Sequence, residues 1–242
     1  MKLENRVIIV TGGTSGIGLE LVKSLSQRNE VIVLGRNASL LNELKEKYSV
    51  IPYQVDLSDM AQVEWAASEI LETHPKIDVL INNAAVQYTP AFTSDDFAYH
   101  TISDEITTNF TSICSLTYLL LPALKQARES AIVNVNSGLA LAPKTSSAVY
   151  CATKSALNAF SLSLRYQLEG SNIKVMQAMM PLVQTKMTDG RGQGKLTPIS
   201  AANALLNGVE NGVLDNDIGK VRLLRWLIRL VPSVAFNMMK RA

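Results

Sequence analysis

The stretch VTGGTSGIGLEL, residues 10–21, places three glycines between an apolar run and a segment with helical spacing. The preceding run, RVIIVT at 6–11, is typical of a buried β-strand. Gly12, Gly16 and Gly18 permit a tight turn and close packing of the following helix on the strand. Unpaired N–H groups at the start of that helix favour an anion such as a pyrophosphate. A turn that binds nothing is the alternative, and no Gly-Lys-Ser/Thr follows that would indicate a P-loop.

The composition excludes several classes of protein. The chain has 242 residues, of which 47% are hydrophobic and 18% charged, as in a globular domain with a sizeable core. A net charge of +2 argues against bulk nucleic-acid binding. The two cysteines, Cys114 and Cys151, have no metal-ligand or disulfide-framework spacing, so we expect no metal and a reducing compartment. No signal-peptide pattern or long uncharged apolar run occurs, so we expect a cytoplasmic protein.

Short β-branched runs alternate with longer segments of helical period. Strands are predicted at 6–11, 30–35, 50–57, 77–85, 130–137 and 173–181, and helices after residue 18 and near 40–48, 60–74, 104–127, 147–169 and 200–211. Apolar strands joined by helices indicate a parallel sheet covered on both faces, and right-handed crossovers make it doubly wound. We therefore expect a single α/β domain with about seven parallel strands and a ligand crevice beyond their carboxyl ends.

The second strand ends in LGRN, residues 34–37. A protein that selects NAD usually has an acidic residue there, which binds the ribose 2′-hydroxyl. This chain has Gly35 followed by Arg36, and a guanidinium pairs with a 2′-phosphate. The pattern favours NADP(H) over NAD(H), with a solvated loop arginine as the alternative.

The segment YCATK places Tyr150 and Lys154 on one face of a predicted helix. Tyrosine is a poor base because its pKa is about 10, and lowering that value to near 7 takes roughly 4 kcal/mol. A nearby ammonium and a positively charged nicotinamide together supply stabilisation of this size, so Tyr150 is the candidate general acid/base. Such a pair also occurs on ordinary helix surfaces.

Two further polar residues complete a candidate catalytic group. Ser137 ends a predicted strand and could hold a substrate oxygen, although strand-end serines are usually turn or cap residues. Asn109 lies within a predicted helix, where asparagine is locally unfavourable. A water molecule that bridges Asn109 and Lys154 would give a proton exit route, and simple hydrogen bonding in the core is the alternative.

Together these residues resemble the short-chain dehydrogenase/reductase family in its simple, single-domain form, over nearly the whole chain. The resemblance implies a Rossmann fold and a catalytic tetrad of Asn109, Ser137, Tyr150 and Lys154. It implies cofactor contacts from Gly12, Thr14, Ser15, Gly16, Ile17, Gly18, Arg36, Asp56, Leu57, Asn83, Ala84, Tyr150, Lys154 and Thr185. The chain departs from the family pattern where Ala85 and Leu182 replace glycines. The glycine turn and LGRN look most similar to bacterial members found near cell-envelope genes, including those associated with teichoic-acid D-alanylation.

The resemblance implies an NADP(H)-dependent oxidoreductase that interconverts a carbonyl and an alcohol on a small molecule. A non-catalytic NADPH sensor and a membrane-surface adaptor are the alternatives. We expect an apolar substrate pocket from residues 86–100, 138–149 and 186–197, with 185–198 as a mobile lid or a plain surface loop. The helices near 104–127 and 150–169 resemble the family's subunit interface, which implies a homodimer or homotetramer.

The segment 220–242 is expected to extend the catalytic domain, residues 1–219. It has six basic residues and no acidic one: Lys220, Arg222, Arg225, Arg229, Lys240 and Arg241. Its arginines at 222, 225 and 229 lie on one predicted helix face and apolar residues, including Trp226, on the other. A basic amphipathic helix with tryptophan can make peripheral contact with a membrane, pack on another subunit or close the substrate pocket.

Overall fold

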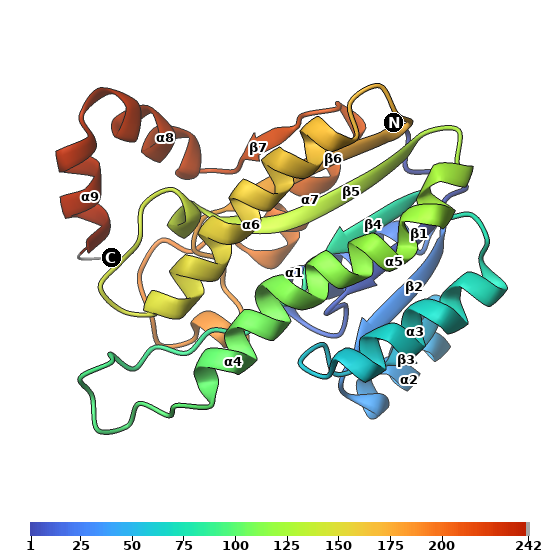
Figure 1. Cartoon of the computed structure of the whole chain (residues 1–242), viewed down its shortest axis with the longest axis horizontal. Helices are drawn as coiled ribbons and strands as arrows, with labels where there is room; N and C mark the ends of the chain where they lie inside the picture. The colour runs from blue at the N-terminus through green and yellow to red at the C-terminus, as the bar shows by residue number, and fades with distance from the viewer. Residues whose placement is uncertain (241–242) are drawn as a thin grey trace.

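The computed structural model describes residues 1–240 and contains a seven-stranded parallel sheet in the order β3-β2-β1-β4-β5-β6-β7 (Figure 1). The strands are β1 (Val7–Thr11), β2 (Glu30–Gly35), β3 (Ile51–Gln54), β4 (Val79–Asn82), β5 (Ser130–Ser137), β6 (Ile173–Met180) and β7 (Asp215–Asp217). The strand order reverses between β1 and β4, which places the expected ligand crevice beyond their carboxyl ends. The predicted single-domain, doubly wound Rossmann fold is confirmed.

Helices cover both faces of the sheet. One layer contains α1 (Gly16–Leu25), α2 (Ala38–Tyr48) and α7 (Pro198–Glu210), and the other α3 (Met60–Thr73), α5 (Ser112–Gln126) and α6 (Ala148–Gln167). Side chains alternate between these layers along each strand, so that Ile8 and Val10 enter the first core and Ile9 the second. Two apolar layers therefore hold the strand ends rigidly in place.

The long helix predicted near 104–127 has three parts. It begins with α4 (Thr101–Ile106), continues through a π-helical turn (Thr107–Thr111) and ends with α5. Helical periodicity does not distinguish a π-turn from an α-turn, and such turns are frequent at functional sites. Strand β7 had no predicted range because its three residues, Asp-Asn-Asp, are polar and pair at the sheet edge with residues 177–179 of β6.

The described part of the C-terminal segment forms α8 (Val221–Leu230) and α9 (Pro232–Lys240). A methyl group added at Gly138 would lie 3.3 Å from Val221 and 3.4 Å from Leu224, so α8 packs directly on the turn after β5. The Thr145 hydroxyl donates to the main-chain oxygen of Lys240 at 2.7 Å. The domain boundary at residue 219 stays a prediction, and Arg241 lies outside the described residues.

No helix within residues 1–240 is both long and apolar enough to cross a membrane.

Candidate active site

The glycine turn between β1 and α1 has backbone angles and close neighbours that leave no room for larger side chains. Gly12 and Gly16 have φ values of +67° and +55°, which favour glycine. A Cβ at Gly12 would lie 2.9 Å from the Cα of Ala84, and one at Gly18 would collide with the carbonyl oxygen of Gly12. The three glycines therefore let β1, α1 and the end of β4 meet.

The end of β4 is tied to this turn by side-chain hydrogen bonds. The Asn83 amide donates to the carbonyl oxygens of Thr11 and Gly12 at 3.0 and 3.2 Å. The Thr11 hydroxyl accepts the N–H groups of Asn83 and Ala84, both at 3.0 Å. The side chain of Asn83, predicted to contact the cofactor, thus supports the turn from behind. The sequence analysis missed Thr11, although a threonine immediately before the glycines was a visible signal.

The start of α1 faces the crevice with unused donors. Ser15 is its N-cap residue, but the Ser15 side chain makes no capping hydrogen bond. The first-turn N–H groups, including those of Ile17 and Gly18, have no acceptor one turn earlier. A Cβ at Gly16 would lie 3.0 Å from the Thr185 side chain, so the loop after β6 reaches this turn. The structure therefore brings Thr185 to the predicted phosphate site.

The ends of β2 and β3 carry the other predicted cofactor residues. Arg36 is exposed beside the glycine turn and forms no ion pair with any residue from 1 to 240. Thr14 lies beside Gly35, the residue before Arg36, since a Cβ at Gly35 would lie 3.2 Å from the Thr14 methyl. Asp56 accepts the backbone N–H and hydroxyl of Ser58 at 2.9 and 2.7 Å. The Leu57 side chain is buried in the core, so only its main chain faces the crevice.

Helix α6 brings Tyr150 and Lys154 to one face, where they are 9% and 2% exposed. The Lys154 Nζ donates to the carbonyl oxygen of Val135 at 2.9 Å and lies 5.7 Å from the centre of the Tyr150 ring. This carbonyl is its one hydrogen-bond acceptor within the described chain, although an ammonium has three donors. Burial lowers the pKa of Lys154 to about 8.

The phenol of Tyr150 behaves differently from the expectation. Burial raises its pKa above the ordinary value, the charge of Glu105 raises it further, and a hydrogen bond from Ser137 acts in the opposite direction. The Lys154 ammonium does not offset this burial. The expected fall in pKa relied on a positively charged nicotinamide as well as lysine, so the chain alone holds Tyr150 as a neutral proton donor.

Ser137 and Asn109 each have a structural role beside the predicted one. The Ser137 hydroxyl accepts the N–H of Leu139 at 3.1 Å and so caps a short 3₁₀ turn, while it also faces Tyr150. Asn109 is fully buried in the π-helical turn and exchanges two hydrogen bonds of 2.8 Å with the main chain of Val86. Its second amide hydrogen points to Thr153 at 3.4 Å. A water bridge to Lys154 would therefore use oxygen atoms of Asn109 rather than its amide donors.

The sequence analysis missed Glu105, which lies one helical turn before Asn109. Its carboxylate is 2% exposed and accepts the backbone N–H of Tyr88 at 2.8 Å. Burial raises the pKa of this carboxyl. Glu105 and Asn109 thus hold residues 86–88, a wall of the predicted substrate pocket, at two points. Their spacing of four on one helix was the available signal.

The residue before α6 has a strained backbone. Ser147 has a φ of +60°, and its buried hydroxyl has no hydrogen-bond partner among residues 1–240. Both features are costly for a residue other than glycine. They lie three positions before Tyr150, so strain is stored where α6 begins.

The two departures from the family pattern are tolerated locally. Leu182 is absent from the residues with positive φ, so glycine is not required there. Its carbonyl oxygen accepts the N–H of Leu196, and the Leu196 carbonyl accepts that of Gln184, both at 2.9 Å. The segment 185–198 is therefore anchored near both ends, and its role as a lid stays a prediction. Ala85 is half-buried next to Ala84.

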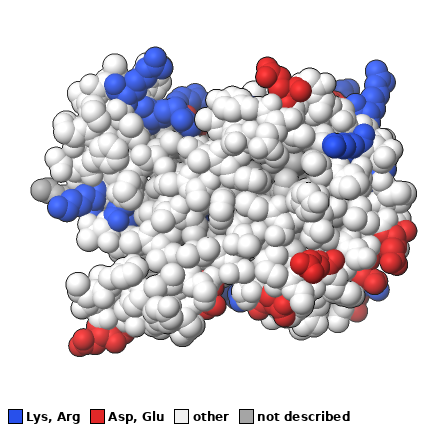
Figure 2. Space-filling model, in the orientation of Figure 1, with Lys and Arg blue, Asp and Glu red and all other residues white. Residues whose placement is uncertain are grey.

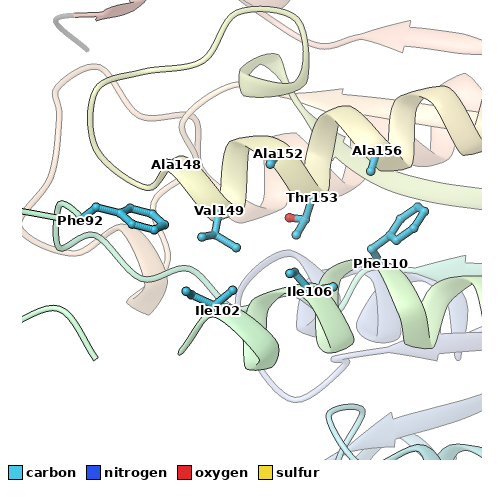
Figure 3. Close-up of a pocket in the computed structure, with 9 residues that line it drawn as sticks. All are labelled: Phe92, Ile102, Ile106, Phe110, Ala148, Val149, Ala152, Thr153 and Ala156. Carbon is cyan, nitrogen blue, oxygen red and sulfur yellow. The ribbon is translucent and has the colours of Figure 1, made fainter. Parts of the chain in front are cut away.

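An apolar groove of about 440 Å³ lies between α4, the π-helical turn and α6. We call it the α4–α6 groove, and Figure 3 shows Phe92, Ile102 and Val149 directed toward one another in it. Its lining residues are Phe92, Ile102, Ile106, Phe110, Ala148, Val149, Ala152, Thr153 and Ala156. The groove shares only short parts of the predicted substrate pocket and lies between the helices expected at a subunit interface.

Within residues 1–240, no group of three or more His, Cys, Asp or Glu side chains is arranged to hold a metal ion.

Comparisons with known proteins identify relatives of this arrangement. The family model for short chain dehydrogenases matches residues 6–195. The uncharacterized oxidoreductase DltE of Bacillus subtilis is 40% identical over 187 residues, 76% of this chain and 74% of that protein. The NADP-dependent 3-hydroxy acid dehydrogenase of Schizosaccharomyces pombe is 30% identical over 80% of this chain and 77% of its own. The expected family is thereby confirmed, and the chain lies close to DltE-like members of it.

A solved structure agrees with the same assignment. A short chain dehydrogenase from Burkholderia cenocepacia in complex with NADP has a TM-score of 0.88 and 25% identity, with 99% of both chains covered. A Burkholderia phymatum protein in complex with NAD, at 19% identity and a TM-score of 0.83, shows the shared fold.

Proposed function

This chain belongs to the short-chain dehydrogenase family, and on that premise we propose that it is an NADP(H)-dependent oxidoreductase acting on a small-molecule carbonyl or alcohol. The observation that carries the proposal is the burial of Tyr150 and Lys154 beside Ser137, at the same edge of the parallel sheet as the glycine turn. Burying an ammonium with one acceptor is costly. A non-catalytic sensor would use Lys154 to bind a cofactor, but it would have no use for a buried phenol beside Lys154 and Ser137.

The residues around the turn fit a dinucleotide. The unpaired N–H groups at the start of α1 suit a pyrophosphate. The two unused donors of Lys154 suit hydroxyl groups of a ribose. Arg36, exposed and without a carboxylate partner within the described chain, suits a 2′-phosphate and supports a preference for NADP(H) over NAD(H). The family includes structures with NADP and with NAD, so Arg36 carries this preference.

The nicotinamide, when bound, supplies or accepts the hydride. In the reducing direction Tyr150 donates its phenolic proton to the carbonyl oxygen, which becomes the alcohol hydroxyl. The Ser137 hydroxyl donates a hydrogen bond that orients this oxygen. The Lys154 ammonium stabilises the phenolate that results, because the two groups share a buried site. Asn109 holds the loop at Val86 beside the site.

We further propose a homodimer or homotetramer built on the α5–α6 side. The α4–α6 groove is apolar, and Tyr118 and Tyr166 on α5 and α6 are 77% and 65% exposed. Large exposed apolar patches commonly mark interfaces. A cytoplasmic location is supported by Cys114 and Cys151, which are both free thiols.

The test is NADPH oxidation across a panel of ketones and aldehydes, with Tyr150→Phe as the blank. We expect Tyr150→Phe to lower kcat by about 10²–10⁴-fold, the usual contribution of a general acid. Its affinity for NADPH, measured by fluorescence titration, should stay within about twofold, since phenylalanine keeps the ring and its packing. Unchanged turnover in Tyr150→Phe would refute this assignment of the acid.

A further inference from the structure

The C-terminal helices have a second apolar face that the fold does not use. Their inner face packs Leu224, Ala235 and Met239 with Ala142 in a small core. On the outer face of α8, Leu223, Trp226 and Leu230 are 61%, 59% and 70% exposed. These positions have the spacing i, i+3 and i+7, so they form one stripe along the helix.

Helix α9 continues this exposed apolar surface. Val231, between the two helices, is exposed, and so are Val234 and Met238, which lie one turn apart on α9. Phe236 is exposed on another side of α9. We call six of these residues the outer stripe: Leu223, Trp226, Leu230, Val231, Val234 and Met238. An exposed apolar surface of this extent, concentrated on two short helices, indicates a binding partner.

Positive charges flank the outer stripe. Lys220, Arg222, Arg229 and Lys240 form no ion pair with any described residue, whereas Arg225 pairs with Asp217 at 2.8 Å. Residues 221–240 contain no carboxylate. Figure 2 shows blue atoms around this end of the molecule, with white surface between them. The partner should therefore combine an apolar layer with negative charge.

We propose that α8 and α9 dock on the surface of a bilayer that contains anionic lipids, with the outer stripe in the headgroup and upper acyl region. A basic amphipathic helix with tryptophan has the properties that interfacial binding needs. Each basic residue near such a surface adds about fivefold to binding. Neither helix needs to cross the membrane, because the inner face stays packed on the protein.

The docked helices adjoin the candidate active site. Helix α8 covers Gly138, which directly follows Ser137, and Thr145 is bonded to the end of α9. A membrane at the outer stripe would be separated from the loop that joins Ser137 to Tyr150 by the thickness of these two helices. We therefore assign the substrate to the class of long-chain carbonyl compounds dissolved in lipid, a step that rests on the proposed function.

The docking test is co-sedimentation of the full chain with vesicles of phosphatidylcholine alone or mixed equally with phosphatidylglycerol. Wild type should bind the anionic vesicles, and less so at high salt because charges are then screened. The double variant Trp226→Asp/Leu230→Asp should bind at least about tenfold more weakly. Tyr99→Asp changes an aromatic residue that is 85% exposed outside these helices, and should bind as wild type does.

Three outcomes would overturn the docking proposal. They are no binding of wild type at low salt, equal loss in the Tyr99→Asp control, or a double variant that changes only the molecular mass measured by light scattering. The last result would instead assign the outer stripe to a second copy of the chain. Circular dichroism and NADPH titration show whether the variants are folded.

The substrate class is tested with a long-chain aldehyde in anionic vesicles against a short soluble aldehyde. The double variant should lose at least about fivefold in kcat/KM on the vesicle-borne aldehyde and keep its rate on the soluble one. If the double variant keeps the wild-type kcat/KM on both aldehydes, the substrate class is refuted, while docking is left intact. If no carbonyl is reduced at all, the proposed function fails, whereas vesicle binding is still measured independently.

Discussion

The glycine turn and the catalytic helix treat buried polar groups in opposite ways. Around the turn, Thr11 and Asn83 bond to neighbouring main-chain atoms, and the strand ends are tied together. Around α6, Lys154 has one acceptor and the Ser147 hydroxyl has none within the described residues. The polar groups of the glycine turn stabilise the fold, whereas the buried polar groups of α6 destabilise it because they lack partners. The comparison indicates that the turn is rigidly hydrogen-bonded, whereas α6 buries polar groups that lack partners, as the proposed catalytic role of Tyr150 and Lys154 requires.

The largest effect that sharpens this contrast is expected from Lys154→Met. Burial lowers the pKa of Lys154 from 10.5 to about 8, which corresponds to a cost of about 3 kcal/mol at neutral pH. Removing the charge should therefore raise the free energy of unfolding by about 1–3 kcal/mol, after the loss of one hydrogen bond, while turnover falls steeply. Urea unfolding and NADPH oxidation measure the two effects.

The pH dependence gives an independent check on the same residue. Between pH 8 and 10.5 the unfolded chain retains a proton on Lys154 that the folded chain has released, so raising the pH favours the folded state. Wild type should gain stability relative to Lys154→Met across this window. Lys76 is exposed, and the Lys76→Met control should change neither the free energy of unfolding at neutral pH nor its change between pH 8 and 10.5 by more than about 0.5 kcal/mol. If Lys154→Met is less stable than wild type, the buried ammonium stabilises α6, and the contrast with the glycine turn is wrong.

Gly18→Ala should distort the glycine turn between β1 and α1. A methyl group there collides with the Gly12 carbonyl and lies 2.6 Å from the Asn83 amide, so we expect a loss of about 1–3 kcal/mol in stability. NADPH affinity should fall at least about tenfold, since the start of α1 must move. Gly170→Ala is the control, with a positive φ but nothing within 4 Å, and should cost about 1 kcal/mol with normal NADPH binding. Wild-type affinity in Gly18→Ala would show that the turn binds nothing.

Arg36→Asp should change the cofactor and leave the fold intact. An exposed carboxylate there would repel a 2′-phosphate and accept a hydrogen bond from a 2′-hydroxyl. We expect NADPH binding to weaken about tenfold and NADH binding to strengthen, as measured by fluorescence titration. Lys45→Asp makes the same charge change at an exposed position on α2 and should alter neither affinity. If the two affinities are unmoved in Arg36→Asp, the arginine is a solvated loop residue.

The smallest effect is expected from Glu105→Gln. Burial raises the pKa of Tyr150 most, and Cys151 and the Glu105 charge raise it further, so removing the Glu105 charge should lower that pKa. In alcohol oxidation the phenol must lose its proton to act as the base, so activity falls at low pH. This acidic limb of the pH profile should move to lower pH by less than about one unit. Glutamine keeps an acceptor for the Tyr88 N–H, so the melting temperature should stay close to that of wild type, whereas Glu105→Ala should lower it. If the pH profile of Glu105→Gln is the same as that of wild type, Glu105 only holds the backbone at Tyr88 in place and does not affect the pKa of Tyr150.

The candidate site was predictable where a residue acts through its backbone or its place on one helix. The spacing of Gly12, Gly16 and Gly18 demanded a tight turn, and the Tyr150–Lys154 spacing placed both on one face of α6. Glu105 and Thr11 were missed because their partners, Tyr88 and Asn83, are distant in the sequence or lie on another strand. The raised pKa of Tyr150 depends on burial, which no local pattern reports.

The sequence by itself determined most of the succession of strands and helices, the glycine turn and the Tyr150–Lys154 spacing, because periodicity and steric demands act over a few residues. The family followed from the resemblance of these motifs taken together. Tertiary structure decided which groups are buried and which are left with too few partners. It placed α8 and α9 on the loop between Ser137 and Tyr150, and it formed the π-helical turn at Asn109. These features arise from contacts between segments far apart in the chain, where desolvation outweighs local preference.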